Sequence, residues 1–85
     1  MNPQDKEDLR RAVRTYLAER PALAFNEGMI HGHVSRQVAC TVPEVIGACE
    51  LLLDHGQIKE IPNKMGSQRY FRIHAEGTLA HERGQ

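Results

Sequence analysis

The stretch from Thr41 to Ile61 constrains the fold more than any other part of the chain, because it contains a helix start, a helix stop and a change of period. Thr41 and Glu44 stand three residues apart, the spacing of a capping box, in which each side chain accepts from the other residue's backbone N–H. Apolar residues follow at intervals of three and four as far as Gly56, a residue type that often ends helices in the left-handed conformation. After this glycine the period falls to two, which predicts a strand over Gln57–Ile61.

The predicted helix has one apolar side that we expect to form part of the core. At about 100° per residue, this buried arc takes Val42, Val45, Ala48, Cys49, Leu52 and Leu53. A turn-rich segment leads from the following strand into a second strand over Gln68–Ile73. Alternation predicts that Phe71 and Ile73 face inward and that Tyr70 and Arg72 face outward.

Two further helices are predicted before this stretch. The first runs from Asp5 to Arg20, and its apolar face consists of Leu9, Ala12, Val13, Tyr16 and Leu17. A short strand over Ala22–Phe25 follows. The second helix runs from Glu27 to about Arg36 with Asn26 as its N-cap. Its buried side is expected to contain Met29, Ile30, His33 and Val34.

The order of these elements predicts the fold. Two helices, a capped third helix and a hairpin are typical of an α+β winged helix-turn-helix, with a three-helix core and a C-terminal β-hairpin wing. A short last helix is predicted over Ala75–Glu82. At 85 residues the chain is expected to form a single winged-helix domain, 1–85, because this length supports one small hydrophobic core.

Composition argues against several classes of protein. Eleven basic and eleven acidic residues give no net charge, so we expect no overall attraction to nucleic acid. Two cysteines form no disulfide framework and indicate a reducing compartment. No apolar run reaches membrane-spanning length, and residues 1–5 do not resemble a signal peptide. We therefore expect a cytoplasmic protein with no membrane partner.

The sequence contains no motif for catalysis. It lacks a glycine-rich phosphate loop, a nucleophile elbow and paired carboxylates in a pocket-forming context, so we expect no enzyme activity and no cofactor. Two histidines and two cysteines are a permitted zinc ligand set, namely His31, His33, Cys40 and Cys49. Their spacing does not match a zinc finger, and Cys49 falls on the buried arc, so no metal site is predicted.

The C-terminal part of the chain resembles a known family. The segment IKEIPNKMGSQRYFRIHAEGTLAHE is similar to the end of a family of small winged-helix proteins encoded in Mu-like phages and prophages. The matching pieces are Gly56 and the strand to Ile61-Pro62, the Gly66-Ser67 turn, Tyr70-Phe71, and Ala75-Glu76-Gly77 with Leu79-Ala80-His81-Glu82. The resemblance implies DNA binding, with a role in transcription regulation or in particle assembly.

The hairpin carries the candidate DNA contacts. Basic and polar side chains gather there without an acid between Asn63 and His74, and the turn before the third helix adds two more. A basic loop beside an aromatic side chain is suited to phosphates or to a minor groove. The predicted nucleic-acid-binding residues are Arg36, Gln37, Lys64, Gln68, Arg69 and Arg72. The alternative is a solvated hairpin whose charges prevent edge pairing.

The third helix departs from the DNA-binding pattern. Its exposed arc takes Glu44, Gly47, Glu50, Leu51, Asp54 and His55, which include three carboxylates and no lysine or arginine to meet phosphates or base edges. The rival hypothesis is therefore a protein-interaction module, acting in a homodimer or as a phage assembly or packaging adaptor with no direct reading of DNA. Its predicted interface residues are Glu44, Gly47, Glu50 and Leu51.

One further cluster of charge is open to two interpretations. Arg10, Arg11 and Arg14 lie along one flank of the apolar stripe of the first helix. Charge runs of this kind are usually solvated. The other interpretation is an edge that faces phosphate.

Overall fold

Three helices and three short strands follow one another in the part of the chain that the structure, a computed structural model, describes: residues 2–62, 66 and 68–74. Their order is α1 (Pro3–Ala18), β1 (Phe25–Asn26), α2 (Glu27–Val34), α3 (Val42–Asp54), β2 (Ile58–Ile61) and β3 (Tyr70–Ile73). The predicted last helix, Ala75–Glu82, lies outside these residues. None of the helices in the described ranges combines the length and apolar character that crossing a membrane requires.

The helix starts follow from side-chain caps. Asn26 caps α2 by accepting from the Met29 N–H at 2.8 Å. The capping box at α3 is confirmed, since the Glu44 carboxylate accepts from the Thr41 N–H at 2.9 Å and the Thr41 hydroxyl accepts from the Glu44 N–H at 3.3 Å. Gly56 has a φ of 70° and reverses the chain after α3, as predicted.

Two helices end earlier than predicted, because backbone hydrogen bonds that span three residues instead of four form after them. After α1, which ends at Ala18 rather than Arg20, the Arg20 N–H bonds to the Leu17 carbonyl, three residues back. After α2, which ends at Val34 rather than near Arg36, the Gln37 N–H likewise bonds to the Val34 carbonyl. Such three-residue bonds form tight turns that do not continue an α-helix.

The strands form an antiparallel sheet in the order β1-β3-β2. Phe25 of β1 and Glu60 of β2 both pair with Phe71, in the centre of β3. Strand β1 lies over Phe25–Asn26 rather than Ala22–Phe25, and β3 starts at Tyr70 rather than Gln68. The later start of β3 has a physical cause: the N–H of the preceding residue, Arg69, donates to the Glu27 side chain at 2.9 Å instead of joining the ladder.

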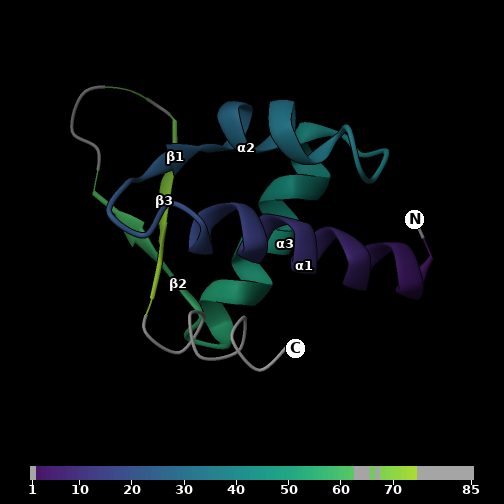
Figure 1. Ribbon diagram of the computed structural model, residues 1–85, viewed down its shortest axis with the longest axis horizontal. Helices are drawn as coiled ribbons and strands as arrows, with labels where there is room; N and C mark the ends of the chain where they lie inside the picture. Colours follow the sequence, from purple (N-terminus) through teal and green to yellow (C-terminus); the bar gives the residue numbers. More distant parts are fainter. Residues whose placement is uncertain (1, 63–65, 67, 75–85) are drawn as a thin grey trace.

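The core lies where α1 and α3 pack on each other and on the inner face of the sheet (Figure 1). All five residues predicted for the apolar face of α1 are buried. The buried hydrophobic set is Leu9, Ala12, Val13, Tyr16, Leu17, Ile30, Val34, Val45, Ala48, Cys49, Leu52, Ile58, Phe71 and Ile73.

Some burial predictions were wrong. Met29 is 50% exposed, because the buried stripe of α2 consists of Ile30 and Val34 and Met29 lies about 100° away from it. Val42 and Leu53 of α3 are half-buried rather than buried. His33 is also half-buried, and its ring stacks on Tyr16 with the ring centroids 4.3 Å apart.

These elements together make the predicted α+β winged helix. Figure 1 shows the sheet at one end of the helical core and the N-terminus at the other end of α1. The wing, defined here as β2 and β3, follows directly after α3. Because β3 lies between β1 and β2, the wing is joined to the rest of the protein along one edge.

Candidate nucleic-acid interface

Arg69, the residue before β3, is surrounded by acids. Its Nε and Nη2 donate to the Glu60 carboxylate of β2 at 3.1 and 2.8 Å, and its Nη1 donates to Glu50 of α3 at 3.2 Å. The guanidinium also lies 5.3 Å from the centre of the Phe71 ring. We refer to Arg69, Glu50 and Glu60 as the wing ion-pair network.

The network favours the charged forms of Arg69 and Glu60. Hydrogen bonding and attraction to Glu60, and then to Glu50, raise the pKa of Arg69 above its ordinary value. The Arg69 hydrogen bonds hold the pKa of Glu60 below its usual range. One cation between two carboxylates leaves this side of the wing with a net negative charge. An external phosphate would therefore have to compete with two carboxylates for the guanidinium.

The other side of the wing has a different character. Side chains that pair across antiparallel strands share a face, and Lys59 of β2 pairs with Arg72 of β3. Both are exposed, and the Arg72 Nε donates to the Pro21 carbonyl at 3.2 Å. We call Lys59, Ile61, Tyr70 and Arg72 the outer wing face; no acid occurs among these four residues.

Lys59 was missed as a candidate by reasoning from the sequence. Two like charges directly opposite each other are unfavourable in an isolated sheet, and an anion between them removes that cost. The signal was present in the alternation of Gln57–Ile61, which places Lys59 outward, but its neighbour across the strands becomes known only from the register. Arg72 is exposed, as predicted, whereas Tyr70 is half-buried.

The structure disperses the remaining predicted contacts. Arg36 and Gln37 lie in the turn after α2, and Gln37 lines a hollow with Asp8 and Arg11 of α1 rather than with the wing. The Gln68 side chain accepts from the Asn26 amide at 3.2 Å. Lys64 lies outside the described residues. The described members of the predicted set therefore fall in two places, at the wing and in the turn after α2.

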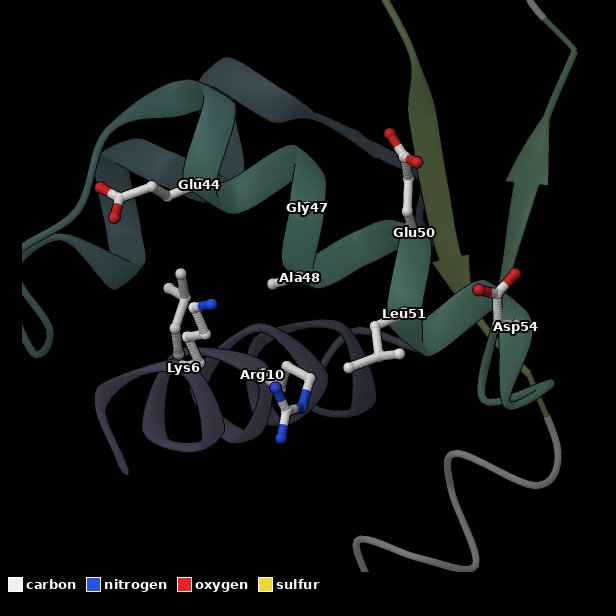
Figure 2. A pocket seen from close by; sticks show the side chains of 9 residues that line it. Lys6, Arg10, Glu44, Gly47, Ala48, Glu50, Leu51 and Asp54 are labelled. Atoms are coloured by element: carbon white, nitrogen blue, oxygen red, sulfur yellow. The ribbon is translucent and has the colours of Figure 1, made fainter. Parts of the chain in front are cut away.

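A groove of about 410 Å³ runs between α1 and α3. It brings together all four residues predicted for a protein interface. The described residues that line it are Lys6, Leu9, Arg10, Glu44, Gly47, Ala48, Glu50, Leu51 and Asp54. Figure 2 shows that Ala48 and Leu51 face α1, whereas Glu44 and Glu50 point away from it. Leu51 is half-buried in this groove, whereas the sequence placed it on the exposed arc of the third helix.

The two histidines and two cysteines considered as zinc ligands are not gathered into one cluster. Among the described residues no group of three or more potential ligands is placed to hold a metal ion. His31 Nε2 lies 2.9 Å from the Cys40 carbonyl oxygen. Burial raises the pKa of the Cys49 thiol to about 12, which keeps it protonated at neutral pH.

Comparison with known proteins agrees with the fold. No protein-family model and no curated protein matches the sequence. Among solved structures the chain is similar to a structure of HOP2, described by its DNA recognition and protein interaction domains and its homologous DNA pairing. The TM-score is 0.65 at 20% sequence identity, and the match covers 78% of this chain and 98% of the HOP2 chain. The likeness is one of fold, that of a winged helix.

Proposed function

We propose that this chain binds double-stranded DNA and that the outer wing face makes the principal contact. The observation that carries the proposal is the fold that the chain shares with the HOP2 structure, which is described in terms of DNA recognition. Lys59 and Arg72 support it, because they stand opposite each other, are exposed and share a face of the wing on which the paired strands place no acid. Phosphate binding is the ordinary use of such a pair.

Arg69 takes a supporting part in this proposal. Its guanidinium is neutralised by Glu60 and Glu50, so it fixes the wing to α3 rather than meeting phosphate. The acidic, exposed side of α3 then does not have to enter a groove of the DNA. The wing would contact the DNA backbone, which gives affinity and orientation with little reading of sequence.

The test is binding of duplex DNA by fluorescence anisotropy at several salt concentrations. Replacing Lys59 and Arg72 together with Ala should weaken binding and reduce the log–log salt slope by about 0.9 for each phosphate that the protein no longer neutralises. Lys6→Ala is the control, because Lys6 is an exposed cation near the start of α1. Figure 1 shows that this end of α1 lies away from the sheet. Equal binding by all three proteins would exclude the outer wing face.

A second candidate function, a protein-interaction module, is favoured by the α1–α3 groove. Leu9, Ala48 and Leu51 give the groove an apolar floor, while acids border its α3 side and Lys6 and Arg10 border its α1 side. This arrangement suits a partner helix with an apolar stripe. It also suits a second copy of the chain, in which the acidic and basic borders would be exchanged.

Gly47 allows a clean test of the groove. A Cβ at this position would meet nothing within 4 Å, so Gly47→Gln should fold normally and fill the groove with its side chain. Gly32→Gln is the matched control, because it places the same side chain in equally open space on α2. In sedimentation measurements, loss of self-association by Gly47→Gln alone would assign the interface. Unchanged association in both proteins would exclude it.

A phage or prophage origin, a role in transcription regulation and a role in particle assembly rest on the resemblance of the C-terminal segment alone. We propose them as finer assignments of the same DNA-binding domain. Mapping the genomic DNA segments that the bound protein protects from nuclease digestion would test the regulatory role. Protection confined to promoters would support it, and uniform protection would favour a packaging or architectural role.

A further inference from the structure

A second hollow lies between α1 and the end of α3, apart from the outer wing face. It has a volume of about 170 Å³, well above the roughly 10–15 Å³ that one water molecule needs. Its lining is mostly polar and consists of Glu7, Arg10, Arg11, Arg14, Leu52, His55 and Gln57. We call it the Arg14 pocket.

Arg14 is unusual among the cations that the structure describes. Its residue surface is only 8% exposed, and its Nη1 donates to the Gln57 side-chain oxygen at 3.3 Å. Its Nε is fully buried and has no hydrogen-bond partner in the described part of the chain. None of the ion pairs formed between described residues includes Arg14.

Among the described residues that line the pocket, none supplies the missing counter-charge. Their sole carboxylate, that of Glu7, lies 3.7 Å from the Arg11 guanidinium, to which it is paired. Arg10 and Arg14 have no other acid among these described lining residues. Burial, and then the nearby charge of Arg11, lower the pKa of Arg14, but an arginine remains protonated in proteins. A buried cation without a partner is costly, and the cost is removed by an anion from outside.

We propose that the Arg14 pocket binds a phosphate group, either free or in a nucleic-acid backbone. Arg14 and Arg10 would donate to the phosphate oxygens, and the planar guanidinium is suited to paired hydrogen bonds with such an anion. Gln57 holds the Arg14 side chain in place by accepting from Nη1. The site uses no residue of the outer wing face, so failure of the wing contacts would leave it intact.

The direct probe is inorganic phosphate, followed by NMR of the arginine Nε–Hε signals of the whole chain. Phosphate should shift the Arg14 signal in a saturable manner, and sodium chloride of equal ionic strength should not. Arg10→Gln should weaken phosphate binding about tenfold, the effect of losing one charge-assisted hydrogen bond. Arg20→Gln, which removes a partly exposed arginine just after α1 and outside the pocket, should leave phosphate binding unchanged.

A second variant keeps the proposal testable if Arg10→Gln has little effect. In Arg14→Met an apolar chain replaces the unpaired cation, so its melting temperature should exceed that of the wild type in chloride. Phosphate should raise the melting temperature of the wild type and leave that of Arg14→Met unchanged. If phosphate stabilises both proteins equally, the pocket is not the site and the proposal fails.

A further arm distinguishes the two sources of phosphate. If inorganic phosphate shifts the Arg14 signal, a free phosphate is sufficient and the site is established. If only duplex DNA shifts it, and Arg10→Gln removes that shift, the ligand is a backbone phosphate and the site is again established. If neither shifts the signal, the proposal is overturned. The DNA titration is repeated with the protein that carries both Lys59→Ala and Arg72→Ala. This variant lacks the proposed wing contacts, so a shift of its Arg14 signal reports binding at the pocket.

Discussion

Arg69 and Arg14 are both held by side chains from other elements, yet their surroundings differ in one respect. Arg69, whose side chain is 33% exposed, donates three hydrogen bonds to two carboxylates. Arg14, which is far more buried, donates to a neutral amide. Within the described part of the chain, the more exposed arginine therefore has its counter-charge and the more buried one does not.

This difference shows that the position of a cation on a fold does not by itself indicate its role. Arg69 lies on the wing, where a DNA contact is expected, but its charge is used to join β3 to β2 and α3. Arg14 lies on a helix flank that would ordinarily be solvated, but it is buried and has no acid partner among the described residues. A zero net charge conceals this uneven pairing of acids and bases.

The largest effect is expected at the base of the wing ion-pair network. Phe71 is fully buried beneath Arg69, so Phe71→Ala should lower the free energy of unfolding by about 3–5 kcal/mol. Leu23, which is 54% exposed, provides the control: Leu23→Ala should change it by less than about 0.5 kcal/mol. Urea denaturation measures both. Similar losses in the two variants would mean that the sheet does not pack on the core as described.

The same substitution at the two arginines should have opposite effects. Arg69→Met leaves Glu50 and Glu60 without their cation and should destabilise the protein by about 1 kcal/mol, a value reduced by the solvent exposure of the pair. Arg14→Met removes an unpaired buried charge and should stabilise it by about 1 kcal/mol. Urea denaturation in phosphate-free buffer provides the measurement. Effects of the same sign would remove the contrast between the two sites.

The stability changes caused by Arg69→Met and Arg14→Met should also respond differently to pH. The pKa of Glu60 is lower in the folded protein than in the unfolded chain, so its ion pair contributes fully above the ordinary glutamate value of 4.5. The contribution is lost as the pH falls through the lowered folded value. The stability difference between wild type and Arg69→Met should therefore shrink below about pH 4.5. The stability difference between wild type and Arg14→Met should persist below this pH, since no carboxylate of the described residues is paired with Arg14. If both stability differences shrank together as the pH fell, the prediction would be contradicted.

The smallest effect concerns the two acids of the network. Glu60 accepts two hydrogen bonds from Arg69 and Glu50 accepts one. Glu50→Gln should therefore cost roughly 0.3 kcal/mol, and Glu60→Gln should cost more. Raising the salt concentration should reduce both losses, because the groups are exposed. A larger loss for Glu50→Gln would mean that α3, not β2, is the main anchor of Arg69.

Much of the fold could be predicted from local signals. The caps at Asn26 and Thr41 and the left-handed Gly56 depend on residues within a few positions of each other, and all three are confirmed. The buried stripe of α1 follows from its period in the same way. The pairing of charges does not, because Arg69 meets acids nine and nineteen residues away. Residues that are so far apart in the sequence are brought together only by strand register and by the packing of α3 on the sheet.

The candidate sites were accordingly harder to predict than the elements that carry them. Arg14 stood in the sequence as one of three flanking arginines, and its burial depends on Gln57, which is 43 positions further along the chain. Lys59 became a candidate only once the register paired it with Arg72. Leu51 was expected on the exposed arc of α3, and its place in a groove beside α1 was not foreseen, because that depends on how the two helices cross.

The first turn of α2 holds the start of β3 through two side chains. Asn26 accepts from the Met29 N–H and donates to Gln68, and Glu27 accepts from the Arg69 N–H. Opening β3 therefore means releasing side chains that belong to the start of α2. In native-state hydrogen exchange, amides of β3 and of the first turn of α2 should open together as one cooperative unit. A ligand that engages the wing would in this way slow exchange in a helix that it does not touch.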